Sequence, residues 1–87
     1  MTRTPEQVAA DEALTAAIEA VQMAYHGEPE GVLTTYVVVA KRRWWDEEGD
    51  SMTAVYIDVR DGDLPPDEQL GLAEYAAARI RRRIAED

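Results

Sequence analysis

A basic and aromatic run at residues 41–45, Lys-Arg-Arg-Trp-Trp, is the first stretch of this sequence whose residue types could do chemistry. Basic side chains bind phosphate groups and tryptophan stacks on unpaired bases, so such a run could bind nucleic acid. Arginines near the end of the chain could extend the surface, and the residues of this hypothesis are Lys41, Arg42, Arg43, Arg79, Arg82 and Arg83. The next stretch, 46–68, holds nine acidic residues against Arg60 alone, which disfavours a phosphate-binding surface. Nucleic-acid binding is therefore the alternative function, and the run is first interpreted as a solvated strand end.

Closely spaced carboxylates are the second feature, with Asp58, Asp61 and Asp63 set around a glycine. Oxygen ligands in a glycine-containing loop can bind Ca²⁺ or Mg²⁺. The run lacks the spacing and the closing glutamate of an EF-hand, and aspartate and glycine are also ordinary residues of tight turns. The acidic stretch 46–50 is explained in the same way, as a solvated hairpin turn. The sequence therefore predicts no metal site and no cofactor.

The single histidine, His26, precedes Gly27, where a helix is expected to end. A protonated imidazole there interacts favourably with the helix dipole. One histidine cannot form a multi-histidine metal site, and the absence of cysteine excludes a thiol nucleophile. The glycines do not form a phosphate-binding loop. We therefore predict no catalytic residue, no small-molecule substrate and no enzymatic activity.

Two helices are expected to position these residues. The first spans about 5–26, because Thr4 and Gln7 fit a capping box and apolar residues recur at helical spacing after it. The second spans about 66–84. Its apolar residues are spaced by three and four positions and form one stripe: Leu70, Ala73, Ala77, Ile80 and Ile84.

Between the helices, strands are expected at about 32–45 and 51–60, where β-branched and aromatic residues are frequent. Their close spacing favours an antiparallel hairpin around the acidic turn. The predicted architecture is a single small α+β domain, 1–87, of order αββα, with the hairpin covered on one face by both helices.

The hairpin is expected to be apolar on both faces. If Val39 pairs with Ile57, alternation divides the side chains between the two faces. One face carries Leu33, Val37, Val39, Val55, Ile57 and Val59, and the other carries Tyr36, Val38, Ala40, Trp44, Met52, Ala54 and Tyr56. Two short helices can cover one face but hardly both, and a ribbon of two strands is marginal by itself. A monomer whose helices bury both faces is the alternative.

Aromatic and methionine side chains are enriched in protein–protein interfaces, which favours the second face as a contact surface. We predict an interface made of Tyr36, Val38, Trp44, Met52 and Tyr56. It would serve a homodimer or another protein partner. The open strand edges could also join two hairpins into a four-stranded sheet across a dimer.

The acidic balance, 18 acidic against 9 basic residues and a net charge of −9, disfavours binding to anionic membranes and to nucleic acid. The longest uncharged apolar stretch, 32–40, is too short to cross a bilayer, and no signal-peptide pattern opens the sequence. A cytoplasmic protein is expected. An ordered row of carboxylates could also imitate the phosphates of DNA, and the sequence leaves this alternative open.

Three segments resemble a group of small actinobacteriophage proteins of uncharacterised function: the strand at 36–40 (YVVVA), the turn at 44–50 (WWDEEGD) and the helix segment at 70–76 (LGLAEYA). The resemblance covers residues 32–84. It implies a small accessory protein that acts on a host protein during infection or lysogeny, and it assigns no catalytic or binding residue. Together with the hairpin surface, it predicts a non-enzymatic protein–protein interaction module that homodimerises or binds a host protein.

Overall fold

Two long helices flank a two-stranded antiparallel hairpin in the computed structural model of the chain. The elements are α1 (Pro5–His26), β1 (Val37–Trp45), β2 (Ser51–Val59), a 3₁₀ turn η1 (Arg60–Gly62) and α2 (Pro66–Glu86). The α+β class and the order helix, strand, strand, helix are confirmed. The structure describes residues 2–86, so the two ends of the predicted 1–87 domain lie outside it.

Helix α1 begins with the predicted capping box. The Thr4 side chain accepts a hydrogen bond from the backbone N–H of Gln7, and the Gln7 side chain accepts one from the backbone N–H of Thr4. These bonds satisfy donors that the first turn of a helix leaves free. The helix ends before Gly27, whose φ of +73° is a conformation that residues with a side chain rarely adopt.

Strand β1 begins at Val37, five residues later than predicted. The register pairs Val37 with Val59, and it confirms the assumed pair of Val39 with Ile57. Beyond Val59 the partner strand stops, because the chain turns into η1 at Arg60. Residues 32–36 therefore have no strand to pair with, although their composition favours β-structure.

The turn after β2 directs α2 away from the hairpin. Asp61 and Gly62 both have positive φ, +56° and +67°, which reverses the chain sharply. Pro65 and Pro66 follow, and the Gln69 side chain donates a hydrogen bond of 2.6 Å to the backbone carbonyl of Leu64. This bond fastens the first turn of α2 to the preceding loop.

The elements meet at one junction, built from α1, the segment before β1, and η1. Within residues 2–86, Tyr36 is the only buried residue, at 8% exposed, and its hydroxyl lies 2.7 Å from the Thr15 hydroxyl of α1. The Arg60 guanidinium donates to the carbonyl of Leu33. Ion pairs complete the junction, from Arg3 to Asp11 at 2.6 Å and to Asp61 at 3.5 Å and from Arg60 to Asp61 at 3.9 Å.

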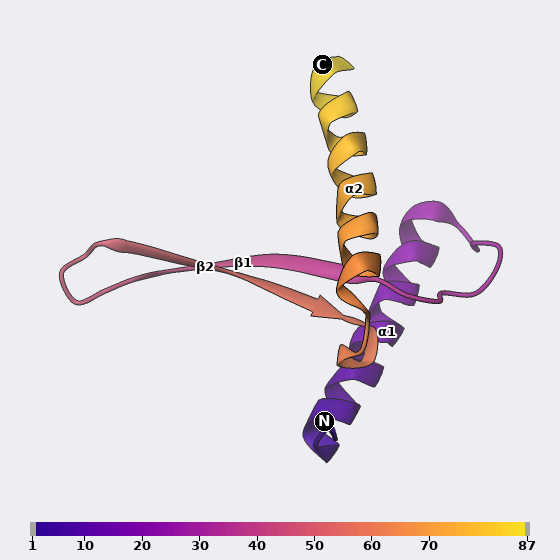
Figure 1. Cartoon of the computed structure of the whole chain (residues 1–87), viewed down its shortest axis with the longest axis horizontal. Coiled ribbons are helices and arrows are strands. Elements are labelled where there is room, and N and C mark those ends of the chain that lie inside the picture. The colour runs from indigo at the N-terminus through magenta and orange to yellow at the C-terminus, as the bar shows by residue number, and fades with distance from the viewer. Residues whose placement is uncertain (1, 87) are drawn as a thin grey trace.

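The packing of the hairpin differs from the expectation that both helices cover one of its faces. Helix α1 contacts η1, α2 contacts β1 slightly, and the rest of the hairpin projects away from both helices (Figure 1). The radius of gyration is 16.2 Å. A compact chain of this length would have a radius of about 12 Å. The physical reason is the turn at Asp61 and Gly62, which sends α2 and the hairpin in different directions.

Replacing Tyr36 should test the junction. Tyr36→Phe removes the hydroxyl that pairs with Thr15 and should lower the free energy of unfolding by about 1 kcal/mol. Tyr36→Ala also removes the ring and should cost about 3 kcal/mol or more. Urea denaturation at one fixed protein concentration measures both. Tyr25→Phe, on an exposed ring of α1, is the matched control and should change little. Equal effects of Tyr36→Phe and Tyr25→Phe would contradict this account of the junction.

Candidate functional site

The hairpin arm presents two faces, because side chains alternate along paired strands. Residues paired across the register share a face, so Trp44 lies opposite Met52 and Ala40 lies opposite Tyr56. We call this side the Trp44 face, and its members are Val38, Ala40, Arg42, Trp44, Met52, Ala54, Tyr56 and Asp58. The other side is the Val39 face, and its members are Val37, Val39, Lys41, Arg43, Trp45, Ser51, Thr53, Val55, Ile57 and Val59.

The Trp44 face keeps large apolar side chains in solvent. Trp44 is 45% exposed and Tyr56 is 51% exposed, Met52 is exposed to a similar degree, and Val38 is half-buried. Four of the five predicted interface residues are thus brought onto one face of the arm. Tyr36 is not among them, because it precedes β1 and is buried against α1 at the junction.

The Val39 face is also exposed, along Val39, Val55 and Ile57. Its distal end is more ordered by polar contacts. The Arg43 guanidinium lies 5.3 Å from the centre of the Trp45 ring and donates a 2.9 Å hydrogen bond to the Ser51 hydroxyl. A cation over the face of an indole ring is attracted by its electrons, so Trp45 already has a partner within the chain.

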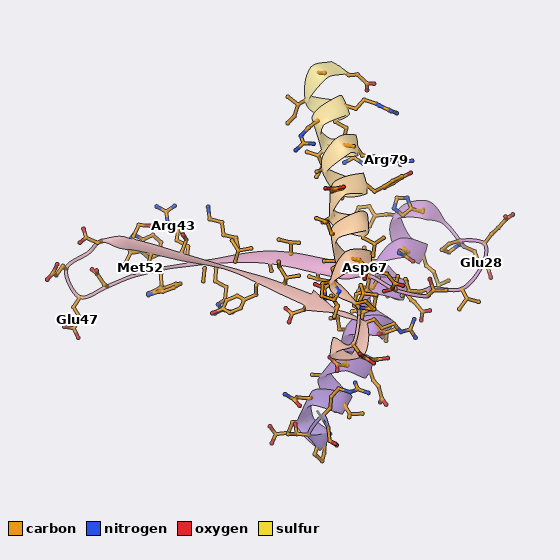
Figure 2. The ribbon with its side chains drawn as sticks, in the orientation of Figure 1. Glu28, Arg43, Glu47, Met52, Asp67 and Arg79 are labelled. Carbon is orange, nitrogen blue, oxygen red and sulfur yellow. The ribbon has the colours of Figure 1, made fainter. Side chains whose placement is uncertain are left out.

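The basic residues of the nucleic-acid hypothesis are divided by the structure. Lys41 and Arg43 point to the Val39 face, whereas Arg42 lies on the Trp44 face. The arginines of α2 belong to another arm, where Arg79 lies well away from the hairpin in Figure 2. Arg79 also stacks on the Tyr75 ring at 5.0 Å and donates to its hydroxyl at 2.8 Å. Among residues 2–86, these basic side chains do not form one continuous surface.

The acidic tip of the hairpin is a cluster whose geometry is that of a turn. Carboxylate oxygens of Asp46, Glu48 and Asp50 lie within 4.8 Å of one another, and all three residues are exposed. One oxygen of Asp46 accepts hydrogen bonds from the backbone N–H groups of Glu48 and Asp50, at 3.0 and 2.8 Å. This is the local bonding that places aspartate at turns. The cluster is therefore explained by its turn.

The other acidic run is divided among separate roles. Asp58 lies on the Trp44 face, and Asp61 pairs with Arg3 and Arg60 at the junction. The hydrogen bond from Arg3 to the Asp11 carboxylate raises the pKa of the Arg3 guanidinium above its ordinary value. His26 is exposed as the last residue of α1, the position expected from the sequence.

The apolar stripe of α2 is a surface that the sequence reasoning missed. Leu70, Ile80 and Ile84 are all more than half exposed, although they were expected to cover the hairpin. The signal was present in the sequence, since a stripe over the whole of a long helix needs an equally long partner. The hairpin has a similar length and apolar faces, but α2 contacts it only slightly, at β1.

The total solvent-exposed area of the chain also shows that little of its surface is buried. A folded monomer of 9.7 kDa exposes about 5,100 Å². This chain exposes 7705 Å². The surplus of about 2,600 Å² agrees with the exposure of large apolar side chains on the hairpin, on α2 and on the last turns of α1.

Comparisons with protein families, with curated proteins and with solved structures found no match to this chain. Among the helices of residues 2–86, neither α1 nor α2 combines the length and the apolar character needed to cross a membrane. The candidate site therefore rests on its own geometry.

Removing the Asp46 carboxylate should loosen the tip of the hairpin. Asp46→Ala deletes the acceptor of two backbone N–H groups, so the amide protons of Glu48 and Asp50 should exchange with solvent about tenfold faster or more. Hydrogen exchange followed by NMR measures this. Glu47→Ala removes a neighbouring carboxylate that accepts neither bond, and it should leave both rates unchanged. Faster exchange in both variants would mean that charge, and not the hydrogen bonds, orders the turn.

Proposed function

We propose that this chain is a non-enzymatic protein–protein interaction module that binds its partner through the Trp44 face of the hairpin. The observation that carries the proposal is the exposure of Trp44, Met52 and Tyr56 on an arm held only at its base. Aromatic, methionine and arginine side chains are the residues that protein interfaces favour. Arg42 lies among them on the same face.

The structural roles of several polar side chains favour a binding function over a catalytic one. The Asp46 carboxylate closes the hairpin turn, Asp61 pairs with two arginines, and Thr15 bonds the tyrosine of the junction. Each of these groups is accounted for by the fold. The exposed apolar surface is the feature that the fold leaves without a role, and contiguous exposed apolar surface marks interaction sites.

The resemblance of residues 32–84 to small actinobacteriophage proteins adds a biological context to the proposal, namely infection of a host cell by a phage. In that setting the chain is a phage accessory protein in the cytoplasm of the host cell, either as a homodimer or bound to a host protein. The net negative charge would keep the chain in solution before its apolar arm binds a partner.

The two adjacent tryptophans allow a matched test of the face. Trp44→Glu places a charge on the Trp44 face and should weaken association at least tenfold, because burial of the interface would strand the charge. Trp45→Glu makes the same change on the opposite face and should have a much smaller effect. Light scattering over a range of concentrations, and capture of a host protein with each variant, measure association.

Equal association by both variants and the parent chain would contradict the proposal. A salt-dependent shift of DNA or RNA in a gel, lost in Arg42→Glu and Arg43→Glu variants but kept in Trp44→Glu, would instead support the nucleic-acid alternative.

A further inference from the structure

Helix α2 lacks a partner along most of its length. It has 21 residues, and Leu70, Ile80 and Ile84 of its stripe are 60%, 52% and 68% exposed. Most helices in proteins owe their stability to the packing of such a stripe. Stable packing of this stripe therefore requires an elongated apolar surface that the chain's own fold does not place against it.

The hairpin arm has the matching length. Its nine-residue strands extend about 30 Å, and the 21 residues of α2 extend about 31 Å. Both arms start at the same junction and leave it in different directions (Figure 1). The chain turns through Asp61 and Gly62 between the two arms, and the hairpin and α2 of one chain contact each other only slightly.

We propose that the partner is a second copy of this chain, and that the Trp44 face of each hairpin packs on the α2 stripe of the other copy. This rests on the proposed function, since it names the partner of the same face. A two-fold axis that bisects the two arms exchanges their directions, so it lays each hairpin along the partner's α2. Both contacts form at once, and the assembly closes as a dimer.

The charges along the two arms select this direction of packing. The hairpin ends in four acidic residues at positions 46–50, and Figure 2 places Glu47 at the tip. Helix α2 ends in arginines, of which Arg81 and Arg83 flank the stripe on either side. Parallel arms bring the acidic tip to these arginines. Antiparallel arms would bring it to Asp67 and Glu68 in the first turn of α2.

Side-chain sizes agree with the same alignment. Near the junction, the large Tyr56 would face the small Ala73, at about 10 Å along each arm, with Leu70 at about 6 Å. Towards the ends, Trp44 and Met52 would face Ile80 and Ile84, at about 21–27 Å. A large residue thus meets a small one near the junction, and large apolar residues meet one another towards the ends of the arms.

The surplus of exposed area fits the size of such an interface. Two chains together carry about 5,000 Å² more exposed surface than two compact monomers. Obligate homodimers bury about 2,000–5,000 Å² or more. The surplus of the two chains reaches the upper part of this range, so enough exposed surface is present for such an interface.

A cross-linking experiment tests the arrangement, and the absence of cysteine makes each introduced thiol unique. Glu47→Cys marks the hairpin tip and Arg83→Cys marks the end of α2. The two variants are mixed, unfolded and refolded together, and treated with a short bismaleimide. We expect a covalent dimer in the mixture and little from either variant alone, since the two tips of one dimer point apart. Glu6→Cys mixed with Arg83→Cys is the control and should not cross-link.

Charge exchange provides a second readout. Glu47→Lys with Glu48→Lys should raise the dimer dissociation constant about tenfold, and so should Arg81→Glu with Arg83→Glu. A mixture of these two double variants should restore association in the heterodimer, because the reversed tip meets the reversed helix in one arm pair and the other arm pair keeps its original charges. Glu28→Lys with Glu30→Lys makes the same change of charge in the loop away from both arms (Figure 2) and should have little effect.

Each outcome separates this inference from the proposed function. Cross-linking of Glu47→Cys with itself would show that hairpins meet tip to tip, which overturns the exchange of arms and keeps the Trp44 face as an interface. A monomer at all concentrations would overturn the second copy as partner, and capture of a host protein that Trp44→Glu abolishes would still support the proposed function. A monomer for which Trp44→Glu changes nothing would overturn both.

Discussion

Burial of Tyr36 against α1 is the interaction on which the arrangement of the arms depends. It is the only buried side chain within residues 2–86, and its hydroxyl reaches Thr15 while the neighbouring Leu33 carbonyl accepts from Arg60. These contacts join the segment before β1, helix α1 and the turn after β2. Beyond the junction, α2 contacts the hairpin only slightly, at β1, so the two extend as separate arms.

An arrangement with so little burial has a direct energetic consequence. A chain of this length must bury most of its apolar surface to offset the entropy lost on ordering its residues. The hairpin and α2 are regular along their whole length and yet expose their apolar residues. In the proposed dimer, contacts between the two copies would supply the stabilisation that these residues lack within one chain. Under that proposal, folding and association would be one process, as in homodimers whose monomers are not stable.

Local structure was predictable where a short-range rule decides it. The capping box at Thr4 and the helix end at Gly27 follow from neighbouring residues. The pair of Val39 with Ile57 was an assumed register, and the structure confirms it. The start of β1 was predicted five residues too early, because residues 32–36 have β-type composition and a strand also needs a partner. That partner ends at Val59, where positive φ angles at Asp61 and Gly62 turn the chain.

The sequence by itself determined the four elements and their order, since periodicity and turn chemistry act over a few residues. The register of the hairpin, and with it the residues that share each of its faces, was an assumption that the structure confirmed by pairing Val39 with Ile57. Only the tertiary structure decided that Tyr36 leaves the exposed face to become the buried anchor, that the basic run is split between two faces, and that the α2 stripe has no partner in its own chain. Those outcomes depend on the direction in which each element leaves the junction, and direction is set by a few dihedral angles and long-range contacts that no pattern of residue types specifies.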